Sequence, residues 1–384
     1  MALRIETSRS TGSGGGGGTV QDPTNLWIIP TDEGATAGNT RGVSAVDLQS
    51  SRALAAQVAS GSCSVISGGY DNMASTNFSV VAGGWNNSST SNTGAVVGGG
   101  YLNLSTGKRS TVAGGQSNTA SNNYATVSGG KDNTAQTGYA TIGGGALNYA
   151  PASYATIGGG TANTTSGTYS AVGGGCGNVS SEFWGTIAGG RDNRSSANYS
   201  IVGGGGSNTA SATYSVVGGG RFNVASGSYS FVGGGNYGVA NKFGQQAHAT
   251  GRFVASGDAQ TSQLVARNQT TDATVTELFL DGVDDRLAIA TDTVWVFEAT
   301  IVARRTDADN EGAGYKISGV IDNNAGTTAL IGAISKTTFG EDTAAWDVTA
   351  EADDTNDALV IKVTGENAKT INWVAFVRTT EVTG

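Results

Sequence analysis

The chain contains few of the residues that build chemical sites. Its 384 residues include two cysteines, Cys63 and Cys176, and one histidine, His248. Without a CxxC pair or a second histidine, the sequence excludes a zinc-finger-type site and a disulfide framework. Only 3 prolines accompany 62 glycines, which excludes a collagen-like chain and a proline-rich linker. The glycine must therefore serve another architecture.

Long apolar runs are also missing. No stretch of 18 or more apolar residues occurs, so we expect no membrane insertion. The first twenty residues have no apolar core of the signal-peptide kind, so we expect synthesis in a cytoplasm without export by a signal peptide.

Charge is unevenly distributed along the chain. Residues 1–60 carry 4 Lys/Arg and 5 Asp/Glu, residues 61–250 carry 7 and 4, and residues 251–384 carry 10 and 21, which gives −1, +3 and −11. An acidic C-terminal part repels phosphate backbones, so we expect no nucleic-acid partner.

What the chain does have is a repeat of 15 residues. Each unit carries a Gly-Gly-x-x-Asn element, and a strict period in a glycine-rich chain is typical of a solenoid. One step, between Asn87 and Asn103, is 16 residues. The asparagines are Asn72, Asn87, Asn103, Asn118, Asn133, Asn148, Asn163, Asn178, Asn193, Asn208 and Asn223.

The unit predicts one β-coil. An aromatic residue lies six positions after the asparagine and a Val or Ile nine after it, as in Tyr139 and Ile142. We interpret this as a short strand from the aromatic to the aliphatic residue, a glycine corner, a turn at the asparagine, and a second short strand around Ala135. Small residues such as Ala140 share the core face with the aliphatic residue because strand side chains alternate.

The segment Tyr214-Ser-Val-Val-Gly-Gly-Gly-Arg-Phe-Asn-Val-Ala-Ser-Gly-Ser-Tyr229 resembles two kinds of repeat. It is similar to the head repeats of YadA-type trimeric autotransporter adhesins, and more similar to the glycine-rich repeats of bacteriophage tail fibre proteins. The resemblance covers roughly residues 60–250. It implies an all-β fold, a trimeric parallel β-roll or β-solenoid shaft of 15-residue coils, and location in a virion.

The residue eight positions after each asparagine points away from the coil's core. It changes from Thr126, Thr141 and Thr156 to an apolar set nearer the C-terminus. Since one coil buries too little apolar surface to offset the ordering of its glycines, we expect this face to pack against other copies of the chain. The resemblance implies that the assembly is a homotrimer. The predicted interface residues are Ile201, Val216 and Phe231.

The two ends differ from the repeat. Near the N-terminus a short apolar segment, Leu26, Trp27, Ile28 and Ile29, is a candidate contact with another virion protein. The alternative interpretation is a leader that caps the first coil. After residue 250, eight alternating runs predict a jelly-roll-like β-sandwich knob. These runs are 263–267, 274–280, 293–304, 314–320, 329–335, 344–350, 358–364 and 371–377. We expect Trp295, Phe297, Trp346, Trp373 and Phe376 to be core aromatics.

Residues that could carry catalysis are sparse in the repeats. Residues 61–250 contain four acids, Asp71, Asp132, Glu182 and Asp192, with no evident pair of the kind that hydrolyses glycosides. The acid-rich segment 307–312 lacks the glutamate that completes an EF-hand loop. The sequence therefore predicts that the chain is not an enzyme and holds neither a metal nor another cofactor.

These observations together predict a phage tail fibre or receptor-binding protein. We expect residues 1–60 to attach to the virion, residues 61–250 to form the shaft, and residues 251–384 to form a knob that contacts a glycan or protein of the host surface. Two alternatives remain open: a head or neck decoration fibre with a purely structural role, and the head of a bacterial trimeric adhesin.

Overall fold

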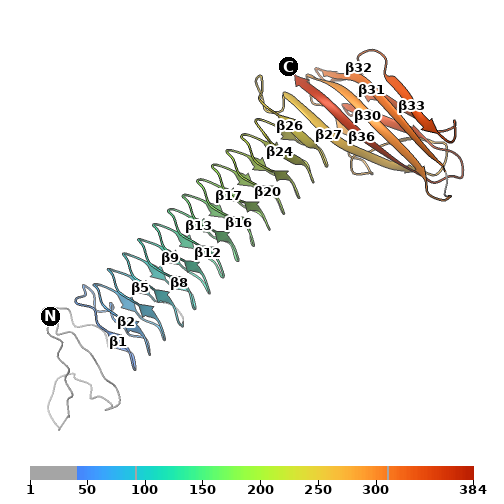
Figure 1. The fold of residues 1–384 in the computed structure, drawn as a ribbon. Coiled ribbons are helices and arrows are strands. Elements are labelled where there is room, and N and C mark those ends of the chain that lie inside the picture. The colour runs from blue at the N-terminus through green and yellow to red at the C-terminus, as the bar shows by residue number, and fades with distance from the viewer. Residues whose placement is uncertain (1–40, 91–92, 309–310) are drawn as a thin grey trace, which may run out of the picture. The chain divides into compact units, whose positions relative to one another are not determined.

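The computed structural model describes residues 41–90, 93–308 and 311–384, and these form an all-β fold. Within that part of the chain, no helix is long and apolar enough to cross a membrane. Internal contacts divide the chain into two units, Met1–Gly177 and Asn178–Gly384. Parallel β-solenoid coils occur in both units, and the second unit also contains a β-sandwich (Figure 1).

In the first unit, two columns of two-residue strands run through successive coils (Figure 1). Strands within a column pair in parallel and in register, as Thr126 does with Thr141. The first column comprises β1 (Val46–Asp47), β2 (Val65–Ile66), β4 (Val80–Val81), β6 (Val96–Val97), β8 (Thr111–Val112), β10 (Thr126–Val127), β12 (Thr141–Ile142), β14 (Thr156–Ile157) and β16 (Ala171–Val172). The second comprises β3 (Met73–Ala74), β5 (Ser88–Ser89), β7 (Leu104–Ser105), β9 (Thr119–Ala120), β11 (Thr134–Ala135), β13 (Tyr149–Ala150) and β15 (Thr164–Thr165).

The interior of each coil is narrow. Ala135, Ala140 and Ile142 are fully buried, and their equivalents stack into one apolar cluster along the first unit. The expected alternation of a small and an aliphatic residue on the core face is therefore confirmed. Such a core contributes little apolar surface per residue, so other interactions must hold the coils.

Buried asparagines supply those interactions. The Asn133 side chain donates from Nδ2 to the carbonyl oxygens of Gly129 (3.0 Å) and Gly145 (2.8 Å). Its Oδ1 accepts the backbone N–H of Asn148 (3.0 Å). The same pattern recurs from coil to coil and forms a ladder of amides that fixes each glycine corner to the next coil.

The turn geometry differs from the prediction in two places. The left-handed backbone falls on the residue before the asparagine, as in Asp132 (φ 56°), while Asn133 itself is buried in the ladder. The aromatic residue was expected within a strand, but Tyr139 (φ 61°) occupies a left-handed turn position. Stacking between rings of successive coils compensates this backbone cost, since Tyr139 and Tyr154 lie 4.8 Å apart and nearly parallel.

In the second unit the solenoid columns continue the same pattern. One column comprises β17 (Val179–Ser180), β19 (Arg194–Ser195), β21 (Thr209–Ala210), β23 (Val224–Ala225) and β25 (Val239–Ala240). The other comprises β18 (Thr186–Ile187), β20 (Ile201–Val202), β22 (Val216–Val217), β24 (Phe231–Gly235) and β26 (Gln246–Ala249).

The sandwich consists of two antiparallel sheets. In the large sheet β27, β36, β30 and β31 are neighbours in that order, and β31 also pairs with β32 and β33. In the small sheet β35 pairs with β34, β28 and β29. The strands are β27 (Ala259–Thr270), β28 (Val275–Glu277), β29 (Leu287–Ala288), β30 (Thr293–Arg305), β31 (Gly312–Asn324), β32 (Thr327–Leu330), β33 (Ser335–Glu341), β34 (Asp347–Asp353), β35 (Ala358–Thr364) and β36 (Ile371–Thr383).

The core of the sandwich lies between its two sheets. Trp295, Phe297, Trp346 and Trp373 are buried there, as expected. Phe376 was wrongly assigned to this core: it lies on the opposite face of β36 from Trp373 and is half-buried. The expected strand at 329–335 is also wrong, because these residues include the turn between β32 and β33. Strand β33 was missed because all seven of its residues are exposed, so its sequence has no alternation of buried apolar and exposed polar residues.

The amide ladder makes a testable prediction. Replacing Asn133 with Ala removes both Nδ2 donors and leaves the buried N–H of Asn148 without its acceptor, so we expect a loss of about 2–4 kcal/mol in the free energy of unfolding. Asn122→Ala, at an exposed turn, should change it by less than about 0.5 kcal/mol. Urea unfolding followed by circular dichroism measures both, and equal effects would contradict a stabilising ladder.

Two adjacent glycines provide a second test. Gly160 has φ +88°, and a Cβ there would lie 2.1 Å from the carbonyl oxygen of Gly175 in the next coil, whereas a Cβ on Gly159 meets nothing within 4 Å. Gly160→Ala should therefore cost more than about 2 kcal/mol of unfolding free energy, and Gly159→Ala should be close to neutral. Thermal melts of the two variants would contradict this account if they coincided.

Candidate interaction surface

The predicted interface residues form one stripe on the second unit. In-register pairing of β20, β22 and β24 places Ile201, Val216 and Phe231 one above the next on the side facing away from the coil's core. Ile201 is 42% exposed and Phe231 is 40% exposed. The structure thus brings the three side chains together on an open face; the partner for that face stays a prediction.

Sequence reasoning overlooked related residues in the first unit. Val65, Val80 and Val96 occupy the same position of their coils, pair in register and are half-buried. Their signal was present in the repeat alignment, because they too lie one residue before the buried aliphatic residue. The outward face is therefore apolar near the start of the described coils as well. In the coils between Thr111 and Thr156 the same outward position is threonine.

The solenoid of the second unit passes into the sandwich through hydrogen-bonded strands. Strand β26 pairs with β24 in parallel and with β27 in antiparallel orientation, where Gln246 lies opposite Gln263 and His248 opposite Thr261. His248 is therefore an exposed residue of this junction. A shallow depression of about 370 Å³ lies here, lined by Phe231, Gly233, Gly234, Gly235, Gln246, Ala247, His248, Thr261 and Gln263.

A buried polar network supports the junction from inside. The Gln260 side chain accepts the N–H of Val239 (2.9 Å), donates to the Val239 carbonyl (2.9 Å) and also donates to the carboxylate of Glu381 (3.0 Å). Burial lowers the pKa of Lys242, and the charge of Glu381 opposes that shift. The last coil is thereby tied to β27 and β36 by paired polar groups.

Exposed aromatic rings follow the solenoid turns. In the second unit Tyr199, Tyr214 and Tyr229 stack at 4.9 and 5.1 Å between centroids. Each inner ring uses both of its faces on its neighbours, so only ring edges and hydroxyls are open to a ligand. We therefore interpret these columns as reinforcement of the turns and not as platforms for sugar stacking.

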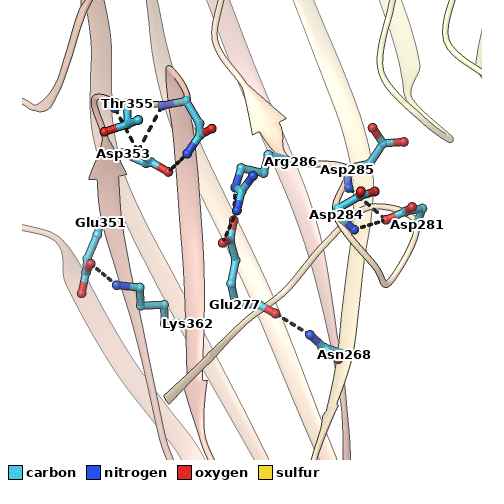
Figure 2. A network of polar contacts seen from close by, with 11 residues as sticks. Asn268, Glu277, Asp281, Asp284, Asp285, Arg286, Glu351, Asp353, Thr355 and Lys362 are labelled. Atoms are coloured by element: carbon cyan, nitrogen blue, oxygen red, sulfur yellow. Dashed lines mark hydrogen bonds and ion pairs between the residues drawn. The ribbon is translucent and has the colours of Figure 1, made fainter. Parts of the chain in front are cut away.

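The acids of the sandwich form local structures (Figure 2). Asp281 accepts the backbone N–H groups of Val283, Asp284 and Asp285, and the Val283 bond is the main reason that the pKa of Asp281 is lowered. Burial, together with the neighbouring acids, raises the pKa of Asp285.

Other acids in the same view hold ion pairs or turns. Glu277 pairs with Arg286 (3.1 Å), and Glu351 pairs with Lys362 (2.5 Å) (Figure 2). Asp353 accepts the Asn356 side chain, which lowers its pKa. Across residues 41–90, 93–308 and 311–384, no group of His, Cys, Asp or Glu is arranged to hold a metal ion.

The N-terminal contact residues predicted from the sequence, Leu26, Trp27, Ile28 and Ile29, lie outside the described residues.

Comparisons with known proteins give only distant likenesses. No family model matches the chain, and no curated protein matches it. Three solved structures are tailspike proteins. Gp49 of Acinetobacter baumannii bacteriophage Fri1, described as a capsular polysaccharide depolymerase, has 10% identity and a TM-score of 0.23, over 89% of this chain and 70% of that one. The tailspike of A. baumannii phage AM24 has 8% identity and a TM-score of 0.22, over 86% and 68%. That of Acinetobacter phage vB_ApiP_P1 has 9% identity and a TM-score of 0.24, over 90% and 81%. At these values the likeness identifies no family.

The comparison corrects the prediction that the chain is not an enzyme. That expectation is contradicted by gp49 of phage Fri1, one of the three similar structures, which is described as a capsular polysaccharide depolymerase. The prediction was wrong because it counted carboxylates within the solenoid of one chain. A catalytic pair can also combine groups from other segments or from neighbouring copies.

The loop before β27 gives a prediction on pH. Although burial of its carboxylate opposes the shift, the N–H groups of Val254, Phe253 and Ala255 hold the pKa of Asp258 below its usual value. Because this folded-state pKa is lowered, its stabilisation is present above the unfolded value near 3.8 and is lost as pH falls through the lower folded value.

We therefore expect hydrogen-exchange protection of residues 253–255 to be constant from pH 7 to 5 and to decline severalfold in acid below about pH 4. Asp258→Asn should lower this protection already at pH 7. Asp272→Asn, at an exposed turn elsewhere, serves as the control. Protection that is unchanged by Asp258→Asn would contradict the role of the carboxylate.

Proposed function

We propose that the chain is an attachment protein of a bacteriophage tail. In this proposal residues 1–60 dock on another virion structural protein, residues 61–250 form a repeat shaft, and residues 251–384 present a knob to a glycan or protein of the host surface. The resemblance of the repeats to those of phage tail fibres supports the virion location. The three tailspikes are proteins of phages, and one is described as acting on capsular polysaccharide.

The observation that carries the proposal is the junction between β26 and β27. A terminal domain on a flexible linker swings freely, whereas here solenoid strands and sandwich strands share one hydrogen-bonded sheet. The Gln260 network fixes the same connection from inside. Such a joint holds the sandwich in a defined orientation on its supporting coils, which suits a protein that presents a binding surface at a distance.

A homotrimer is part of this proposal. The narrow coil core gives a single chain little apolar burial, and the stripe of Ile201, Val216 and Phe231 offers more of it to further copies.

Adsorption experiments test the function with the full-length chain. Fluorescently labelled protein should bind host cells, and an excess of unlabelled protein should reduce adsorption of the virions at least about tenfold if it occupies their receptor. Virions that lack the chain should fail to adsorb. Normal adsorption of such virions, together with protein that binds no cells, would contradict the proposal and favour a head or neck decoration fibre.

A second experiment with the same full-length protein distinguishes binding of capsular polysaccharide from its cleavage. Incubation with purified capsular polysaccharide, followed by size-exclusion chromatography of the polymer, shows whether its length falls. Retention on cells with polymer of unchanged length indicates binding alone, and a shortened polymer indicates a depolymerase. Finding the chain on a bacterial surface and in no virion would favour the adhesin alternative.

A further inference from the structure

The large sheet of the sandwich has one covered face and one open face. Inward residues such as Trp295, Phe297 and Trp373 lie in the core against the small sheet. The alternate residues point away from that core. An antiparallel sheet with one solvated face normally carries polar residues on it, whereas a sheet covered on both sides has nearly continuous apolar strands. The run Val294-Trp-Val-Phe297 in β30 is of the second kind.

The open face carries apolar residues in cross-strand rows. At one end Val302 lies opposite Val374 on β36 and opposite Gly314 on β31. A Cβ on Gly314 would lie 3.9 Å from Phe339, so this ring extends the row onto β33. Phe339 is 66% exposed. The row therefore crosses β36, β30, β31 and β33 without a charged residue, and it ends at Arg267 of β27, opposite Val374.

Further rows lie on the same face. Val265 is opposite Phe376, and Val294 is opposite Val382. The exposed valines of the face are 40–57% open to solvent; they are Val265, Val294, Val296, Val302, Val374 and Val382. Contiguous exposed apolar patches beyond roughly 300–600 Å² are unusual on monomers and mark interaction sites.

The charges of this face fit another copy of the same chain. Glu298 forms an ion pair with Lys316 (2.6 Å) and lies opposite Arg378, whose guanidinium lies 5.0 Å from the centroid of the Phe376 ring. Residues 251–384 have an excess of 11 acidic side chains, from 21 acidic and 10 basic, so two copies repel each other over most of this surface. On the open face the three central charges are one carboxylate, Glu298, and two cations, Lys316 and Arg378, so this acidic repulsion is absent there and the face can approach the acidic surface of another copy.

The open face is also continuous with the stripe on the coils. Phe231 pairs with Gln246 across β24 and β26, Gln246 with Gln263 across β26 and β27, and Val265 follows on the same side of β27. All of these side chains are exposed. The stripe and the open face therefore form one surface of a single hydrogen-bonded sheet in the second unit.

We infer that this open face of β27, β36, β30, β31 and β33 is covered by further copies of the chain in the assembled protein. The inference rests on the proposed homotrimer and extends it, because it assigns the self-association surface of the sandwich. The shallow depression beside Phe231 and His248 lies within the same surface and receives side chains of a neighbouring copy.

Sedimentation velocity of full-length variants tests the inference. Val302→Glu places an unpaired carboxylate in the proposed contact and should raise the dissociation constant of the trimer at least about tenfold. Val275→Glu is the matched control: Val275 lies on β28 of the other sheet and is 55% exposed, against 57% for Val302. Circular dichroism and thermal melts verify that both variants fold.

The outcomes separate the inference from the proposed function. A monomeric wild-type protein overturns both the homotrimer and this surface. A trimeric wild type in which Phe231→Asp dissociates while Val302→Glu does not overturns the surface and leaves the homotrimer standing. Val302→Glu that stays trimeric but no longer binds host cells also overturns it, because the face would then serve the receptor.

Thiol labelling provides a second measurement that does not weaken the contact. Cys63 and Cys176 are free and exposed, so both are first replaced by Ser. Thr300→Cys, beside Phe376 on the open face, should then react severalfold more slowly with a bulky maleimide in the trimer than Val275→Cys on the other sheet. Equal labelling rates of the two cysteines would overturn the inference.

Discussion

The solenoid depends on one interaction, the hydrogen bonding of buried asparagine amides to glycine corners. A coil that buries two alanines and one Val or Ile gains little from apolar burial, and its glycines lose much conformational entropy on ordering. Asn133 offsets part of this cost because its single side chain satisfies backbone groups of its own coil and of the next one. The register of the coils follows from this requirement, since each asparagine lies directly above the previous one. The 16-residue step keeps the register, because Asn87 Oδ1 still accepts the N–H of Asn103 at 3.0 Å.

The ladder also explains how the repeat ends. Gly238 occupies the next asparagine position after Asn223, and its N–H still caps Asn223 Oδ1 at 2.8 Å. Because Gly238 has no side-chain amide, it cannot bond to a following coil, and the ladder ends there. Gln260, from outside the repeat, supplies an amide that bonds to Val239 instead. Gln260 of β27 thus takes the place of the repeated asparagine, and the twelve residues of β27 pair with β36.

Much of this architecture could be predicted because the same residue types recur at the same positions of each 15-residue unit and have the same structural role in each coil. The coil period, the core face and the sandwich were expected, as were four of its five core aromatics. The asparagine was misplaced because a residue common in left-handed turns is also an amide donor and acceptor, and sequence does not say which property is used. Phe376 was misplaced because successive residues of a strand point to opposite faces of the sheet. The alternation that begins with the buried Ile371 puts Trp373 on the core face of β36 and Phe376 on the other face. The N-terminal contact lies outside the described residues and stays a prediction.

Both kinds of structure in the second unit share a deficit of burial. In the coils it arises from glycine, which leaves a core one side chain wide. In the sandwich it arises from apolar residues on both faces of β30, of which the small sheet covers one. Because Gln246 and Gln263 join the two regions within one sheet, the same neighbour could cover Phe231 and Val265 together. A single chain of this sequence leaves that surface exposed, and the proposed association of copies would remove it from water.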